Sequence, residues 1–424
     1  MQRILILSGI QLSANPRVVK EADTLADAGY SVEVVGVSLE TQYQQRDMQL
    51  HQGKRWSYTP LFDANSTRST DRLRLLAARA RVRFWSEMYA RVGLSNPRQL
   101  GLAVPELLAY SLANPADLYV LHNPDTLWVG VELLRHGLQI AVDLEDWYSE
   151  DFLPDDRRTY PVEVLRRWER TLLTNATFAT TTSQCLSDAL VAAYGCGPPA
   201  VVHNSFSMKE RSNLDGSIRD RTDRQMRSMC WFSQVMGPER GLETLMDALA
   251  DVTIPFHIHL RGHSRAEYRR ALLARAPAPW RRRIHFHPQV PHSELIARVA
   301  EHDVGFAAEI PYCRNKALTI SNKLPFYLLA GVGVVASDTE GQREVAAVAD
   351  GAVALFKSGD PGDLAAVLNR FLSDDTQIQQ ARGDALIAAQ RFFCWERSAP
   401  VLLNQVEQAI GRRAAATNPA HADA

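Results

Sequence analysis

Four polar residues precede an apolar, helix-like run late in the chain, and all are of types that bind anions: Thr319, Ser321, Asn322 and Lys323. At the start of a helix, free backbone N–H groups and the positive end of the helix dipole point at the same place. Lys323 adds a point charge, and Arg314 and Lys316 bring more positive charge close by in the sequence. This stretch therefore predicts a loop that binds the phosphates of a ligand.

A second group of candidate side chains follows short apolar runs in the first half of the chain: Asn15, Arg17, His122, Asp125, Glu145 and Asp146. These runs are typical of buried strands. Parallel sheets bind ligands at the carboxyl ends of their strands, so these residues are candidates for contact with a ligand. The acidic members fit either a cleft or a solvated rim, because a charge cluster alone does not distinguish the two.

Alternating strand-like and helix-like runs position both groups. Short, strand-like runs rich in apolar residues cover 3–8 and 31–38, and between them apolar residues repeat at helical spacing from Pro16 onward. This order recurs along the chain and predicts parallel sheets with helices on their faces. The chain has neither a G-x-G-x-x-G nor a Walker A sequence, which argues against a dinucleotide oxidoreductase and a P-loop NTPase.

The alternation breaks once, at a polar and charged stretch that is typical of a linker. We therefore predict two doubly wound, Rossmann-like α/β domains with a cleft between the carboxyl ends of their sheets. The predicted boundaries are 1–207 for the first domain, 208–227 for the linker, 228–395 for the second domain, 396–412 for a helix that packs back on the first domain, and 413–424 for a disordered tail.

The composition is that of an ordinary soluble protein, with 46% hydrophobic and 22% charged residues among 424. The net charge of −1 gives no sign of nucleic-acid binding. No apolar run has the length of a membrane span, and the chain opens with a strand-like run rather than a signal peptide. Five scattered cysteines without a C-x-x-C pair predict thiols in a reducing compartment. We therefore expect a cytoplasmic protein.

Residues 71–98 combine several arginines with large apolar residues and predict a basic amphipathic helix. One interpretation is a solvated helix whose apolar face packs on the core. Another is a peripheral contact with an anionic membrane surface or a lipid-linked acceptor. Nucleic-acid binding is the least supported of the three, and we expect none.

Two pairs of alternating histidines suggest a metal hypothesis. His257 and His259 share one strand face, and His285 and His287 share another. Four imidazoles on adjacent strands are able to hold Zn²⁺. The alternative, which we favour, is a polar or partly covered sheet face, so we predict no metal.

Several segments, in order along the chain, resemble retaining GT-B glycosyltransferases of the large family 4. The first half carries NPRVVKEADTLADAGYSVEVV, DLYVLHNPDTLWVG and VDLEDWYSED, and the second half carries GPERGLETL, IHFHPQVPHSEL and ISNKLPFYLLAGVGVVASDTEGQREV. The resemblance covers nearly the whole chain. It implies an acceptor-side first domain and a second domain that binds a nucleotide sugar.

The resemblance also implies roles for residues that match the family pattern. His122 falls where the family has a histidine that reaches the donor sugar, and Arg240 falls where it has a basic residue on the donor diphosphate. The segment 321–323 matches the phosphate-side loop. The family's earlier partner arginine is absent, because Val235 occupies its place.

This chain departs from the family at two acidic positions. The family usually has two glutamates eight positions apart, whereas this chain has Leu318 and Phe326. Neither side chain accepts a hydrogen bond from a ribose hydroxyl or stabilises positive charge on a sugar. Glu309 is the nearest acid upstream and is a candidate catalytic residue.

The resemblance implies transfer of a hexose from a nucleoside-diphosphate sugar to a saccharide, lipid-linked or small-molecule acceptor, with retention of configuration. The sugar nucleotide is a co-substrate, and no cofactor or metal is implied. The family belongs to polysaccharide biosynthesis. The replaced glutamates favour an alternative, a degenerate GT-B protein that binds a nucleotide sugar or a partner without transfer. An epimerase or a phosphorylase has no positive support in the sequence.

Overall fold

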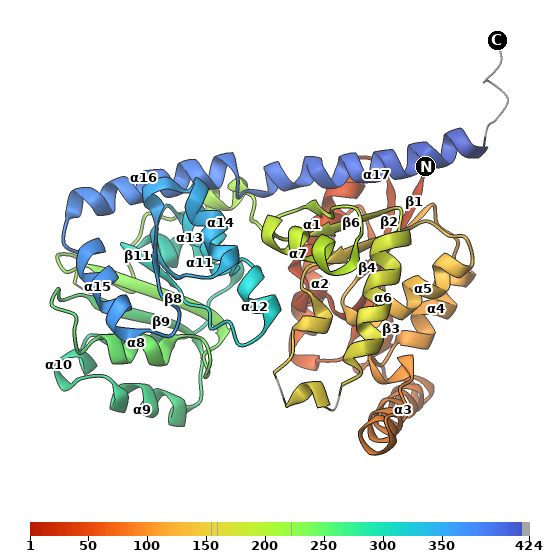
Figure 1. The fold of residues 1–424 in the computed structure, drawn as a ribbon, viewed down its shortest axis with the longest axis horizontal. Helices are drawn as coiled ribbons and strands as arrows, with labels where there is room; N and C mark the ends of the chain where they lie inside the picture. Colours follow the sequence, from red (N-terminus) through yellow and green to blue (C-terminus); the bar gives the residue numbers. More distant parts are fainter. Residues whose placement is uncertain (154, 159, 222, 418–424) are drawn as a thin grey trace, which may run out of the picture. The chain divides into compact units, whose positions relative to one another are not determined.

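The computed structural model describes residues 1–153, 155–158, 160–221 and 223–417, which form two compact units. The first unit contains Met1–Thr182, Leu186–Val202 and the chain from Ala399 onward. The second contains Ser183–Cys185 and His203–Ser398. Each unit is a parallel sheet with helices around it (Figure 1), which confirms the prediction of two Rossmann-like α/β domains.

Over the described residues, the first unit has a seven-stranded parallel sheet in the order β3-β2-β1-β4-β5-β6-β7. Its strands are β1 Arg3–Gln11, β2 Ser31–Ser38, β3 Ser57–Asp63, β4 Leu118–His122, β5 Ile140–Leu144, β6 Phe178–Thr181 and β7 Ala200–Val201. Its helices are α1 Pro16–Asp27, α2 Gln44–His51, α3 Ser69–Val92, α4 Val104–Ala113, α5 Leu127–Arg135, α6 Val162–Asn175 and most of α7 Gln184–Tyr194.

The second unit has a six-stranded parallel sheet over the same described part of the chain, in the order β10-β9-β8-β11-β12-β13. Its strands are β8 Ser228–Val235, β9 His257–His263, β10 Ile284–His287, β11 Val304–Ala307, β12 Gly333–Ser337 and β13 Val353–Phe356. Its helices are α8 Leu242–Ala248, α9 Ala266–Arg275, α10 Ala278–Arg281, α11 His292–Ala300, α12 Arg314–Leu318, α13 Lys323–Ala330, α14 Glu340–Val348, α15 Pro361–Phe371 and α16 Asp375–Arg391.

Strand β1 shows why the apolar runs become central strands. Residues 4–7 are completely buried, as expected for a parallel strand that helices cover on both faces. Helix α1 then begins at Pro16, whose fixed φ suits a first helical position. The Asn15 side chain caps this helix by accepting a hydrogen bond from the Val18 N–H at 3.3 Å. The strand end is therefore followed by a well-defined helix start.

The last helix, α17 Trp395–Thr417, starts in the second unit and belongs to the first unit from Ala399 onward. Residues 418–424 of the predicted tail lie outside the described residues. In the described part of the chain, no helix is both long and apolar enough to cross a membrane.

The segment predicted as a linker, 208–227, is hydrogen-bonded to other parts of the second unit. The side chain of Arg211 donates to the Leu329 carbonyl at 2.6 Å. The Glu301 carboxylate accepts backbone N–H groups of Arg219 and Asp220 at 2.9 and 2.8 Å. Several hydrogen bonds and ion pairs therefore hold this polar stretch, although it buries few large apolar side chains.

Candidate functional site

The second unit brings three basic side chains together, which we call the cationic cluster: Arg240 before α8, Lys316 on α12 and Lys323 at the start of α13. Burial lowers the pKa of Lys323, Glu309 opposes this shift, and the positive charges of Arg240 and Lys316 lower it further. Two other segments of the chain therefore place positive charge near Lys323.

The ammonium group of Lys323 lies between an aromatic ring and a carboxylate. Its Nζ atom is 5.6 Å from the centroid of the Trp231 ring and 3.9 Å from Oε1 of Glu309. The backbone of Glu309 is held by Ser337, whose Oγ accepts the Glu309 N–H at 2.6 Å. A lysine in this position is well suited to a phosphate oxygen, because the ring supports its positive charge.

Two polar residues lie at the start of α13. The Ser321 hydroxyl is buried and has no hydrogen-bond partner among the described residues. Asn322 occupies the N-cap position with an exposed side chain that makes no capping hydrogen bond. A buried hydroxyl without a partner costs free energy, so a ligand oxygen at this helix start would satisfy it.

The two predicted donor-site arginines, Arg240 and Arg314, differ in their surroundings. Arg240 is exposed, and its Nη1 donates to Ser233 Oγ at 3.3 Å. Arg314 is paired with Glu340, with 3.1 Å between Nη2 and Oε2. The charge of Arg314 is therefore already matched by a carboxylate, whereas Arg240, a member of the cationic cluster, is exposed to solvent.

The two positions where the family usually has glutamates are part of the core. Leu318 and Phe326 are 1% and 0% exposed. Phe326 packs edge-to-face against Phe206 and Phe232, with ring centroids 4.8 and 5.2 Å apart. Position 326 therefore contributes to packing in this chain.

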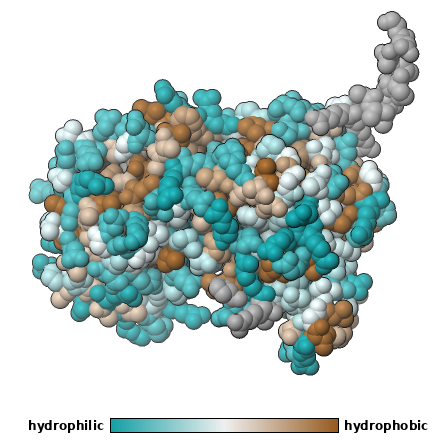
Figure 2. Space-filling view, in the orientation of Figure 1, coloured by the Kyte–Doolittle hydropathy of each residue, from teal (hydrophilic) through white to brown (hydrophobic). Residues whose placement is uncertain are grey.

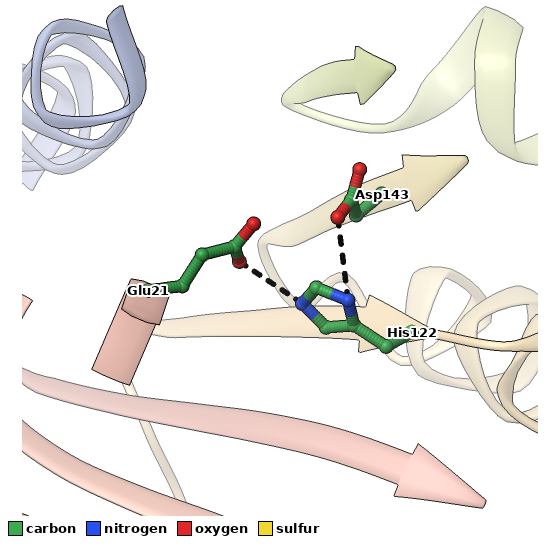
Figure 3. Close-up of side chains that lie close together, drawn as sticks. All are labelled: Glu21, His122 and Asp143. Atoms are coloured by element: carbon green, nitrogen blue, oxygen red, sulfur yellow. Dashed lines mark hydrogen bonds and ion pairs between the residues drawn. The ribbon is translucent and has the colours of Figure 1, made fainter. Parts of the chain in front are cut away.

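The first unit holds a set of charged residues on α1, β4 and β5, which we call the buried ion network: Arg17, Glu21, His122 and Asp143. Figure 3 shows His122 between the two carboxylates, with Nε2 3.0 Å from Glu21 and Nδ1 3.3 Å from Asp143. Arg17 donates to Asp143 at 3.0 Å and lies 3.2 Å from Glu21. Each of these side chains is at most 1% exposed.

The charges of the buried ion network balance. Burial lowers the pKa of His122, but Glu21 and Asp143 raise it further than burial lowers it, so that the net shift is upward. Burial raises the pKa of Asp143, but Arg17 and His122 lower it overall. The two carboxylates therefore favour the protonated, cationic form of His122.

Three of these four residues form the group, among the described ones, whose ligand atoms are close enough to hold a metal ion: Glu21, His122 and Asp143. Arg17 bonds both oxygens of Asp143, however. A divalent cation would have to displace this guanidinium from a network that is already neutral. The geometry therefore favours an ion network over a metal centre.

The remaining acceptor-side candidates lie near this network. Asn15 donates to Asn123 at 3.4 Å. Burial raises the pKa of Glu145 to about 7, with Arg17 opposing the shift and Asp146 adding to it. Because the electrostatic interactions of Glu145 extend to these residues, the first unit brings it together with the buried ion network and Asp146.

Asp125 lies in a narrow space between two glycines. A Cβ atom at Gly9 or Gly101 would come within 2.3 or 2.0 Å of the Asp125 side chain. Burial raises the pKa of Asp125 to about 7. This carboxyl group is therefore close to the point of gaining a proton at neutral pH.

The predicted histidine pairs do lie on adjacent parallel strands, β9 and β10, and His302 joins them. His257 and His259 hydrogen-bond to His285 and His287 at 2.8 and 2.9 Å. Among the described residues these rings do not offer three ligand atoms within the spacing of a metal site. Burial lowers the pKa of all five. We call this neutral group the histidine row.

Two partners of the candidate residues were not predicted from the sequence. Glu21 was missed, although it lies four positions after Arg17 and therefore on the same helix face. Trp231 was missed because it is an ordinary strand residue in the sequence, and only the fold places it under Lys323. The predicted roles of the site residues themselves stay predictions.

Two family descriptions match the chain, one for each half. Residues 14–205 match "Glycosyl transferase 4-like domain", and residues 227–374 match "Glycosyl transferases group 1". No curated protein sequence matches the chain at a significant level.

Solved structures with the same fold are numerous. Sucrose-phosphate synthase from Thermosynechococcus elongatus has a TM-score of 0.68 at 16% identity, over 97% of this chain and all (100%) of that one. HepE from Anabaena in complex with UDP has a TM-score of 0.67 at 16% identity, over 96% and 100%. An E. coli trehalose-6-phosphate protein bound with UDP-2-fluoro glucose has a TM-score of 0.65 at 12% identity, over 96% and 99%. These matches confirm the GT-B fold.

Proposed function

Because the chain belongs to the GT-B glycosyltransferases that join a glycosyl transferase 4-like domain to a group 1 domain, we propose that it transfers a hexose from a nucleoside-diphosphate sugar with retention of configuration. The acceptor is a saccharide, a lipid-linked saccharide or a small molecule. The observation that carries the proposal is the cationic cluster beside the buried, unpartnered Ser321 hydroxyl. Such a cluster fits a diphosphate, which carries negative charge that must be neutralised.

In the proposed reaction, the bond between the sugar and the diphosphate breaks while a bond to the acceptor hydroxyl forms. Arg240, Lys323 and the start of α13 stabilise the charge that develops on the leaving diphosphate. The departing phosphate takes the proton of the acceptor hydroxyl. His122 and Glu309 are the proposed catalytic residues, and no metal or other cofactor takes part.

Two of the similar structures suggest which donor to test first. HepE has been solved with UDP and with UDP-glucose, and the E. coli protein with UDP-2-fluoro glucose. UDP-sugars are therefore the first members of a panel that also includes GDP- and ADP-sugars.

The proposal includes a cytoplasmic location with peripheral contact to an anionic membrane through residues 71–98. A lipid-linked acceptor would meet the enzyme at such a surface. Saccharide or small-molecule acceptors would not require it.

The second candidate function is binding of a nucleotide sugar without transfer. It is favoured by the burial of Leu318 and Phe326, which leaves both usual glutamate positions apolar. The experiment is calorimetric binding of each donor in the panel, followed by hydrolysis and transfer assays with mixed acceptors. Turnover of a donor supports the transferase. Binding without any turnover supports the second candidate, and no binding of any donor overturns both.

A further inference from the structure

Helix α3, Ser69–Val92, turns a large part of its apolar surface outward. In this helix only Leu75 and Ala78 are buried among the described residues. Leu73, Leu76 and Phe84 are 65%, 58% and 56% exposed. These three side chains therefore do not belong to an apolar face that packs on the core.

The exposed apolar residues share one face of α3. An α-helix turns by roughly 100° per residue, so side chains three and four positions apart lie above one another. The exposed set follows this spacing: Leu73, Leu76, Ala77, Ala80 and Phe84. The buried and half-buried set follows the same spacing on the opposite side: Leu75, Ala78, Val82, Trp85 and Tyr89. The helix therefore has one apolar face for the first unit and a second that faces solvent.

A stripe of arginines borders the outward face. Arg72, Arg79 and Arg83 are seven and four positions apart and are all exposed. No ion pair joins Arg79 or Arg83 to an acidic side chain in the described part of the chain. Arg81, on the inner side, is instead paired with Glu106 at 2.8 Å. Two of the arginines beside the apolar face are therefore available to an external negative charge.

The acidic residues of α3 do not cancel this charge. Glu87 is paired with Arg91 at 2.6 Å, and no ion pair joins Asp71 to Arg79 or Arg83 among the described residues. Figure 2 shows hydrophobic and hydrophilic residues side by side on the surface at the position that α3 has in Figure 1. An apolar strip with a basic border is the pattern of a helix that lies in a membrane interface.

We propose that the outward face of α3 docks on an anionic lipid bilayer. Leu73, Leu76 and Phe84 enter the boundary between headgroups and acyl chains, and Arg79 and Arg83 contact lipid phosphates. The charge complementarity selects a membrane over an apolar protein groove, which would bury the arginines unpaired. This specifies the surface behind the membrane contact of the proposed function but does not depend on transferase activity.

The test is sedimentation of the full chain with vesicles of phosphatidylcholine, with and without phosphatidylglycerol. We expect binding to the anionic vesicles, weak binding to phosphatidylcholine alone, and release at about 1 M salt, where the screening length falls to ~3 Å. Nucleotide binding measured without vesicles reports on the donor site separately, so the two proposals fail independently.

Three variants locate the contact. Arg79→Ala with Arg83→Ala should weaken vesicle binding by about 25-fold, or about fivefold for each arginine at the surface. Phe84→Ser should weaken it by about tenfold or more, because it removes an inserting aromatic side chain. The matched control, Arg167→Ala with Arg282→Ala, removes the same charge at exposed sites outside α3 and should bind like the parent protein.

Three results would overturn the proposal. One is the absence of binding at every phosphatidylglycerol content. Another is an equal loss in the control variant, which would indicate a general charge effect. The third is a dimer of the parent protein in light scattering that Phe84→Ser abolishes, together with no vesicle binding, since a second copy would then cover this face.

Discussion

The buried ion network of the first unit and the cationic cluster of the second handle charge in opposite ways. In the network, two cations face two carboxylates in a nearly water-free interior, and every charge has a partner. In the cluster, two cations, Arg240 and Lys316, act on Lys323, and Glu309 lies 3.9 Å from its ammonium group. Removing one member of a balanced buried group leaves an unpaired charge inside the protein, whereas an excess of positive charge attracts an anion. Substitutions in the buried ion network should therefore change mainly stability, and substitutions in the cationic cluster mainly anion binding.

The contrast between the buried ion network and the cationic cluster is tested most strongly by Phe326→Glu, which is designed to give the cluster a second carboxylate. We expect no gain in donor binding and a loss of more than about 4 kcal/mol in the free energy of unfolding. Removing a buried phenylalanine costs about 3–5 kcal/mol, and this variant also buries a carboxyl group among aromatic rings. Denaturant unfolding measures the loss.

Phe326→Leu is the matched control, because it keeps the site apolar and should cost clearly less than Phe326→Glu. A stable Phe326→Glu variant with tighter nucleotide binding would contradict the assignment of position 326 to the core. It would show instead that this position reaches the ligand.

Removing one charge from the buried ion network should lower the free energy of unfolding almost as much as Phe326→Glu. We expect Asp143→Asn to lower the free energy of unfolding by about 3–5 kcal/mol, because Arg17 and His122 then lose a buried counter-charge. Denaturant unfolding at neutral pH tests this prediction.

An exposed pair provides the control for Asp143→Asn. Asp338 is paired with Arg343 on the surface of the second unit, so Asp338→Asn should cost no more than about 1 kcal/mol. Similar losses in the two variants would mean that the buried ion network contributes no more than a surface pair.

A substitution in the cationic cluster should change the affinity for the ligand rather than the free energy of unfolding. We expect Arg240→Ala to weaken nucleotide-sugar binding by about 1.5–3 kcal/mol, the range of a hydrogen bond to a charged group. Its free energy of unfolding should change little, because the side chain is exposed. Calorimetry with the donor panel measures the affinity.

Arg343→Ala removes the same charge from the same unit, but its side chain is paired with Asp338. Nucleotide affinity should therefore be nearly unchanged in this control. Unchanged affinity in Arg240→Ala as well would remove Arg240 from the donor site.

The parallel sheets could be predicted from the sequence, and strand β3, which was not predicted, shows why. Each central strand is a short apolar run, because it is buried on both faces. Strand β3, Ser57–Asp63, is at the edge of its sheet, contains Pro60 and has only one buried residue. An edge strand tolerates proline and polar residues, so it lacks the pattern that identifies the others.

The contacts within the candidate sites were harder to predict, because the side chains that meet there are far apart in the sequence. His122 meets Glu21 across 101 positions, and no periodicity signals such an ion pair. Lys323 was predicted from its position before a helix-like run and Arg240 from the family resemblance, but Trp231 beneath Lys323 was not predicted. Local spacing determines strands and helix caps, whereas side-chain networks depend on which strands become neighbours.

The last prediction concerns how the free energy of unfolding depends on pH. It compares the histidines of the first unit with those of the second. Burial lowers the pKa of His302 to about 3 and that of His259 further, whereas both titrate near 6.5 when unfolded. The unfolded chain therefore binds more protons below pH 6.5. Stability from these rings is fully present above pH 6.5 and falls, as the pH drops, by about 1.4 kcal/mol per pH unit for each ring.

Unfolding of the parent and of His302→Gln between about pH 7.5 and pH 5 tests this slope. The variant should depend less on pH, because it has one fewer ring to protonate on unfolding. His122→Gln supplies the opposite sign: the pKa of His122 is raised, so its contribution is present below pH 6.5 and is lost as the pH rises through its folded value. Equal slopes in the parent and His302→Gln would mean that the histidine row accepts protons while folded, and the contrast between the two units would then be lost.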